Sequence, residues 1–81
     1  MKYTKQDWID GKCAIKWEQE REQIINNLFY EVTKSRVNGY FKYYYISKMF
    51  GDLSSCDYTP DLPIVTIDEL LNENQSFNIW N

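Results

Sequence analysis

Hydrophobic and polar positions repeat with one of two periods along the chain, that of a strand or that of a helix. The places where the period changes mark the boundaries of its elements. Residues 12–17 repeat with a period of two, which places Cys13, Ile15 and Trp17 on one side and polar or small residues on the other. Such alternation is typical of a strand that is covered on one face. The pattern therefore predicts a first strand over residues 12–17.

Residues 18–33 follow helical spacing and predict the main helix. Its apolar stripe consists of Arg21, Ile24, Ile25, Leu28, Phe29 and Val32. A stripe of this width marks the face by which a helix packs on the rest of a domain. Asn26 and Asn27 lie off the stripe, so we expect both on the polar side of the helix.

The strongest β signal follows an Asn38-Gly39 turn, over residues 40–47. Aromatic residues occur there at successive positions, so that both faces of this strand carry them. One face holds Phe41, Tyr43 and Tyr45, and the other holds Tyr40, Lys42, Tyr44 and Ile46. A strand that is buried on one face needs apolar side chains on that face only, so this strand has more aromatic residues than the core requires.

The remaining segments are shorter. A Gly51-Asp52 turn leads into a further short strand over 53–58, and two prolines make residues 59–63 a loop or edge. Ile64, Val65 and Ile67 form a last β-like run.

Both ends of the chain show helix-capping spacing. Thr4 and Asp7 predict a short helical turn that Gly11 ends, and Thr66 with Glu69 predicts a second turn near the C-terminus. Apolar residues within 77–80 suggest that the tail docks on the domain or on a partner.

These elements predict one α+β domain over residues 1–81. We expect an antiparallel or mixed sheet of three to four strands packed on one main helix, in βαβββ-like order, with short helical turns at the ends. The chain shows no internal repeat. A domain of 81 residues rarely forms a deep cleft.

The composition disfavours several kinds of chemistry. The chain has no histidine and only two cysteines, Cys13 and Cys56, which are far apart in the sequence. We therefore expect no disulfide, no metal site, no cofactor and two reduced thiols. Neither a nucleophile–base pair nor a phosphate-binding loop is recognisable, so we expect no enzymatic activity. Without a signal-like or membrane-length apolar run, we expect a cytoplasmic protein that does not enter a membrane.

Charge divides the chain into two parts. Residues 1–48 hold all nine lysine and arginine residues and six acids, whereas residues 49–81 hold six acids and no base. The acidic part can be interpreted in two ways, as a solvated surface or as a face that binds a basic partner.

Binding to another protein is the function that these features favour. The chain has 14 aromatic residues among 81, and tyrosine and tryptophan are enriched where proteins bind each other. We expect Trp8, Trp17, Phe29 and Phe41 to pack as core. The predicted partner-binding residues are Tyr43, Tyr45, Asp52, Asp57, Tyr58, Asp61, Asp68 and Glu69.

The order of motifs resembles a group of small uncharacterised bacteriophage and prophage proteins. The matching pieces are Gly-Lys-Cys-Ala-Ile at 11–15, the helix from Glu18, the tyrosine-rich strand at 40–46, and segments 53–58 and 63–71. The resemblance implies a bacteriophage origin and action in the cytoplasm of the bacterial host. It supplies no catalytic residues.

By analogy with other small bacteriophage proteins, we expect an inhibitor of a host enzyme or immune effector, such as an anti-CRISPR or other anti-defence protein. Its acids would occupy the basic nucleic-acid site or the active site of a nucleic-acid-handling target.

Two alternatives stay open. The first is a nucleic-acid-binding accessory protein in which Tyr40, Tyr44 and Lys42 form a stacking platform on an open sheet face. The sequence pI of about 4.8 argues against direct nucleic-acid binding. The second is a self-assembling protein with the tyrosine-rich strand or the tail at a symmetric interface. A homodimer is also compatible with the inhibitor hypothesis.

Overall fold

The structure is a computed structural model that describes residues 3–71 of the chain. Its elements are α1 (Lys5–Ile9), β1 (Ala14–Lys16), the 3-10 turn η1 (Gln19–Arg21), α2 (Glu22–Thr33), β2 (Tyr43–Ile46), β3 (Leu53–Cys56) and β4 (Ile64–Val65). Residues 67–71 form a further helical turn. The predicted α+β class, with one main helix and a small mixed sheet, is confirmed.

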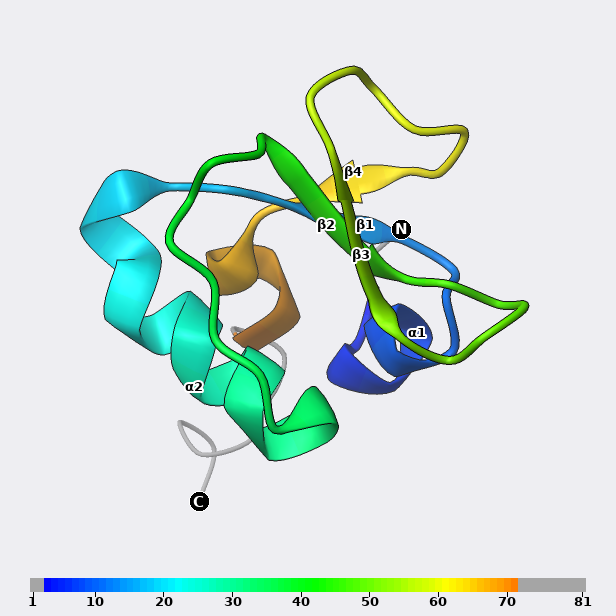
Figure 1. Cartoon of the computed structure of the whole chain (residues 1–81), viewed down its shortest axis with the longest axis horizontal. Coiled ribbons are helices and arrows are strands. Elements are labelled where there is room, and N and C mark those ends of the chain that lie inside the picture. Colours follow the sequence, from blue (N-terminus) through cyan, green and yellow to red (C-terminus); the bar gives the residue numbers. More distant parts are fainter. Residues whose placement is uncertain (1–2, 72–81) are drawn as a thin grey trace, which may run out of the picture.

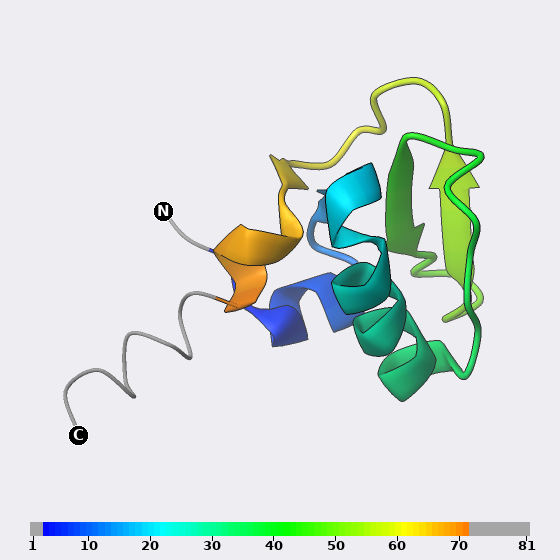
Figure 2. The same ribbon diagram turned by 90° about the vertical axis from the view of Figure 1, so that its left-hand side faces the viewer.

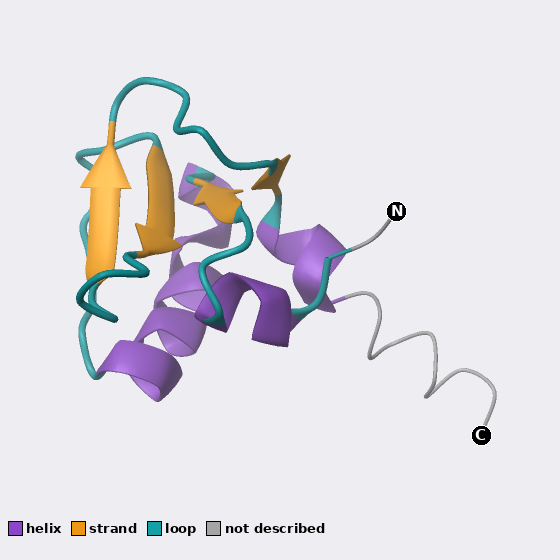
Figure 3. Cartoon of the chain, turned by 90° about the vertical axis from the view of Figure 1, so that its right-hand side faces the viewer, coloured by secondary structure: helices purple, strands orange, loops and turns teal. Residues whose placement is uncertain are grey.

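The four strands form one sheet in the order β3-β2-β1-β4. β1 pairs antiparallel with β2 and parallel with β4, and β2 and β3 form an antiparallel hairpin. In Figure 1, α2 lies on one side of this sheet, and Figure 3 shows the strands side by side with β3 and β4 at the two edges.

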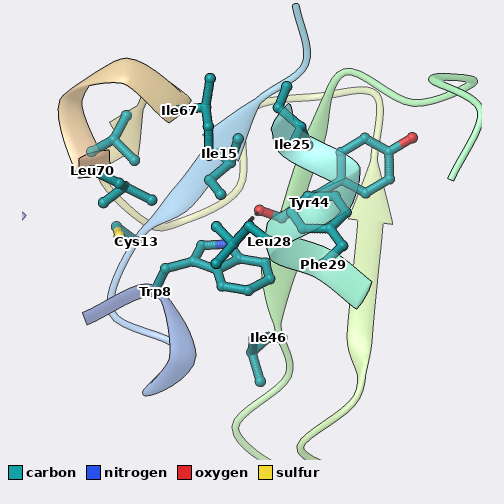
Figure 4. Close-up of a cluster of buried hydrophobic side chains, with 11 residues drawn as sticks. Trp8, Cys13, Ile15, Ile25, Leu28, Phe29, Tyr44, Ile46, Ile67 and Leu70 are labelled. Carbon is teal, nitrogen blue, oxygen red and sulfur yellow. Dashed lines mark hydrogen bonds between the residues drawn. The ribbon is translucent and has the colours of Figure 1, made fainter. Parts of the chain in front are cut away.

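Side chains of α1, α2 and the sheet meet in one aromatic centre. The ring of Phe29 on α2 stacks on Trp8 of α1, with centroids 5.1 Å apart and planes 6° apart. The ring centroid of Phe29 also lies 5.4 Å from that of Tyr44 on β2. Aliphatic side chains of β1, α2 and the last helical turn complete this core, as Figure 4 shows.

The two predicted helix caps are present. Thr4 and Asp7 form a reciprocal capping box at the start of α1. At the last turn, the Glu69 carboxylate accepts a hydrogen bond from the Thr66 backbone N–H, and Glu69 N–H donates to the Thr66 hydroxyl. These pairs satisfy backbone donors that a helix start otherwise leaves without a partner.

The main helix differs from its predicted form in two respects. Its first turn is the separate 3-10 turn η1, where Arg21 is exposed and pairs with Asp68 at 3.1 Å, so Arg21 does not belong to the core stripe. Asn26, expected on the polar side, is buried. The helix ends where Lys34 adopts a left-handed conformation with φ of 62°.

The faces of β2 separate its tyrosines. Tyr44 and Ile46 face the core, and Tyr44 is only 2% exposed, while Tyr43 and Tyr45 are half-buried on the opposite face. The stacking platform of the nucleic-acid alternative, which needs Tyr44 on an open sheet face, is therefore wrong for Tyr44. Its ring packs in the core under α2.

None of the helices within residues 3–71 is long and apolar enough to cross a membrane. The predicted docking of the tail concerns residues outside the described range.

Candidate functional site

Exposed large hydrophobic side chains gather around the β2–β3 hairpin. Tyr40 and Phe41 precede β2, Met49 and Phe50 lie in the turn, and Tyr58 follows β3; their exposed fractions are 81%, 41%, 82%, 74% and 77%. Among the described residues the only other such side chain is Tyr30 on α2. We call these five residues the hairpin surface. Exposed large apolar side chains at both ends of one hairpin make that hairpin a candidate interaction surface.

The strand register explains why residues far apart in sequence meet there. Tyr43 pairs with Cys56, so the residues before β2 lie beside those after β3. The Lys42 N–H donates to the Cys56 carbonyl at 3.2 Å and extends the contact beyond the paired residues. Phe41 and Tyr58 therefore lie at the same end of the hairpin, and Met49 and Phe50 lie at the other end.

A hollow of about 470 Å³ lies on the core side of β3, which we call the edge hollow. Its lining residues are Arg36, Val37, Asn38, Phe41, Tyr44 and Ser55. The Arg36 guanidinium also lies over the ring of Tyr30, 4.1 Å from its centroid.

A second hollow, of about 540 Å³, lies where β1 ends and β2 begins; we call it the aromatic hollow. It is lined by Lys16, Trp17, Gly39, Tyr40, Phe41, Lys42, Tyr43 and Asp57. Trp17 is held there because its backbone N–H donates to the Lys42 carbonyl at 2.8 Å and its indole N–H donates to the Gln19 side chain at 3.2 Å. Phe41 lines both hollows.

Asn26 positions the loop that carries much of both hollows. Its side-chain amide donates to the Val37 carbonyl at 2.9 Å and accepts from the Val37 N–H at 2.8 Å. This pair ties the segment between α2 and β2 to the helix. Sequence reasoning missed this role. The sequence position of Asn26 could have indicated its burial. Asn26 stands three residues before Phe29 and therefore lies at the border of the apolar stripe of the helix.

A third hollow, of about 270 Å³, brings together two of the predicted residues, Tyr45 and Asp61. Lys48 lines the same hollow, just as Lys16 and Lys42 accompany Asp57 in the aromatic hollow. The charge division seen along the sequence is thus mixed in space, since β3 and the loop after it lie beside strands from the basic part of the chain.

The predicted acids occupy different parts of the molecule. Asp52 directly precedes β3 and Asp57 directly follows it, which places them about 16 Å apart at the spacing of an extended strand. Asp68 and Glu69 belong to the helical turn 67–71, which Figure 2 places on the side of the molecule opposite β3. Asp68 pairs with Arg21 and Glu69 caps the turn, so both carboxylates have contacts within the fold.

The structure thus brings Tyr43 together with Asp57, and Tyr45 with Asp61. Asp52 and Tyr58 flank β3 at its two ends. Tyr43 and Tyr45 lie on the same face of β2, so the two hollows that they line border one sheet face. Asp68 and Glu69 do not lie with the other six residues.

The titratable groups of residues 3–71 include no group of three or more metal-ligating side chains. Burial raises the pKa of the Cys13 thiol to about 11, with smaller contributions from the negative charges of Asp7 and Glu69. At neutral pH this thiol is protonated, and a protonated thiol is a poor nucleophile. The arrangement of exposed aromatic rings and mixed charges is suited to binding.

Comparisons of the chain with protein-family models, with curated proteins and with solved structures each gave no match.

Proposed function

We propose that this protein acts by binding another protein through the hairpin surface. The observation that carries the proposal is that five of the six exposed large hydrophobic side chains of the described residues lie in the turn of one hairpin or directly beside its two strands. Aromatic and methionine side chains supply most of the binding free energy at many interfaces because they bury large areas at low entropic cost. The two hollows that Phe41 lines offer recesses for side chains of the partner.

We further propose that the partner is a bacterial enzyme or immune effector and that binding inhibits it. The resemblance to bacteriophage proteins supports this choice, as an analogy. Asp52, Asp57 and Asp61 support it physically, because all three are exposed on or beside the hairpin. Carboxylates placed among aromatic rings can pair with the basic residues that line a nucleic-acid channel or active site.

Affinity capture tests the binding proposal. The tagged chain is incubated with bacterial lysate treated with nuclease, and retained proteins are identified by mass spectrometry. A double variant, Phe50→Ser with Tyr58→Ser, is compared with Tyr30→Ser, which removes an exposed aromatic ring of α2 that lies off the hairpin surface. We expect one retained protein, lost with the double variant and kept with Tyr30→Ser. Recovery of nothing specific, or equal recovery with the double variant, contradicts the proposal.

Neutralising the acids tests the inhibitory mode. Changing Asp52, Asp57 and Asp61 to Asn should release the captured protein and should remove its inhibition by this chain. Increasing salt should have the same effect, since contacts between exposed charges are screened. The control is Glu20→Gln, which neutralises an exposed acid of η1, an element outside the hairpin. Unchanged affinity after the triple substitution would exclude binding dominated by these carboxylates.

The aromatic hollow favours one second candidate function, the binding of single-stranded nucleic acid. Two lysines and four aromatic rings line it, and bases stack on such rings while lysines contact phosphates. Fluorescence anisotropy with a labelled oligonucleotide tests this candidate. If it is correct, Lys16→Ala with Lys42→Ala abolishes binding, whereas Lys12→Ala, an exposed lysine that does not line the hollow, does not.

A further inference from the structure

We infer that the outer edge of β3 receives an extended strand from another protein, and that this strand carries a basic residue near each of its ends. The inference rests on the proposed function and specifies the partner's chemistry and its mode of binding. β3 is the edge strand on one side of the sheet, and within residues 3–71 no other strand pairs with its outer side. Figure 1 shows β3 in front of the other strands.

The hydrogen-bonding pattern shows which groups of β3 face outward. The Ser47 N–H donates to the Asp52 carbonyl at 2.9 Å, and the register pairs Tyr45 with Ser54 and Tyr43 with Cys56. In an antiparallel ladder, paired residues alternate between those that bond each other and those that do not. The backbone N–H and C=O groups of Leu53 and Ser55 therefore point away from β2. An added strand can bond to all four of these groups.

The sequence of β3 leaves this edge unprotected. Natural edge strands are usually protected by a lysine, a proline, a bulge or a very short length. β3 reads Leu-Ser-Ser-Cys and contains no charge and no proline. The opposite edge differs, because β4 has only two residues and Pro63 directly precedes it. Of the two edges, only that of β3 is long and open enough for strand addition.

The edge hollow supplies a site for one side chain of the added strand. Ser55 is exposed and lines this hollow with Phe41, Tyr44 and Arg36. Residues paired across a sheet place their side chains on the same face. The residue of the added strand that lies opposite Ser55 therefore projects toward Phe41, and an apolar side chain fits there.

Charge selects the occupant. Asp52 and Asp57 flank β3, and neither carboxylate forms an ion pair in the part of the chain that the structure describes. A strand with Lys or Arg near both ends would pair with them. A second copy of this chain offers no such residue, because antiparallel pairing of β3 with itself through its outward groups, with Ser55 opposite Ser55, places Asp57 opposite Leu53 and Asp52 opposite Tyr58. Residues 49–58 hold no lysine or arginine, so self-pairing would leave both carboxylates without a cation.

Titration of the labelled full chain with short capped peptides, followed by NMR, tests the inference. The probe is Lys-Thr-Val-Thr-Val-Lys, whose two lysines have the same spacing as Asp52 and Asp57. We expect saturable shifts and slowed amide exchange at Leu53 and Ser55. The analogue with Glu in place of both lysines should bind at least about tenfold more weakly. A third peptide, methylated on the backbone nitrogens that would face β3, should not bind.

Three results would overturn the inference: equal binding of all three peptides, chemical-shift changes confined to the aromatic hollow, or concentration-dependent self-association through β3.

A variant pair separates this inference from the proposed function. Ser55→Pro removes the outward N–H without removing a bond to β2, and proline is tolerated at such edge positions. Ser55→Thr keeps the N–H and serves as the control.

Both variants should retain the fold, as measured by circular dichroism, and only Ser55→Pro should lose binding of the lysine peptide. If the captured protein partner still binds Ser55→Pro but is lost with the Phe50 and Tyr58 double variant, the proposed function stands and strand addition is wrong. If the peptide binds at β3 but no protein is captured, the proposed function is the one that fails.

Discussion

The indole nitrogen of Trp8 donates a hydrogen bond to the backbone carbonyl oxygen of Tyr44 at 3.1 Å, inside the core. This bond, drawn in Figure 4, joins α1 to β2, the strand that carries the half-buried Tyr43 and Tyr45. α1 has only five residues, and so short a helix is not stable by itself in water. The burial of Trp8 and its stacking on Phe29 therefore hold α1 in place and fix the position of β2.

Trp8→Phe should lower the free energy of unfolding by about 2 kcal/mol, because it removes the hydrogen bond and leaves unfilled volume next to Phe29. Urea denaturation measures this change. Tyr40→Phe is the matched control, since Tyr40 is exposed and its substitution should alter stability by less than about 0.5 kcal/mol. Equal stability of Trp8→Phe and the native chain would show that the bond contributes nothing to the fold.

Asn26→Ala should destabilise the protein by about 2 kcal/mol, because it leaves the N–H and C=O of Val37 without their side-chain partner. Asn27→Ala provides the control, since Asn27 is the adjacent residue of the same type and is exposed. Amide exchange at Val37 should accelerate in the first variant and stay unchanged in the second. If exchange at Val37 is unaffected by Asn26→Ala, the amide does not hold this loop.

Sequence reasoning succeeded where structure depends on near neighbours. The two capping pairs, Thr4 with Asp7 and Thr66 with Glu69, involve residues three positions apart and were predicted correctly. The period-two and helical rhythms likewise located β1 and α2 to within a few residues. The α+β class then followed, because a half-covered sheet and a striped helix must cover each other.

Sequence reasoning failed where structure depends on distant partners. One alternative placed Tyr44 on an open face, because the alternation along β2 does not state which face α2 covers. Asn26 was placed on the polar side because its partner, Val37, is eleven residues away in a loop. The charge division along the chain did not predict the mixing of lysines and acids in the hollows, which follows from strand order.

Gly39→Ala should destabilise the protein more than Gly51→Ala. Both glycines have positive φ, 81° and 70°, which costs an alanine about 1 kcal/mol. A Cβ on Gly39 would also lie 2.5 Å from the indole of Trp17, whereas a Cβ on Gly51 meets nothing within 4 Å. Gly39→Ala should therefore also change the fluorescence of Trp17 in the aromatic hollow. Equal stability losses in the two variants would show that the indole moves aside without cost.

Stability should fall between about pH 9 and pH 11 through the titration of Cys13. The pKa of the thiol is 9.0 when the side chain is exposed in the unfolded chain. In the native state burial, and to a smaller extent the nearby charges of Asp7 and Glu69, raise this pKa to about 11. Because the native state holds this proton more tightly, the contribution is complete below pH 9 and is lost as pH rises toward 11. Across this range the loss should reach about 2 kcal/mol. Cys13→Ala provides the comparison, because it removes the thiol and leaves every other side chain in place. Its unfolding free energy, measured by urea denaturation at each pH, should decline less steeply than that of the native chain; parallel declines would show that Cys13 does not contribute.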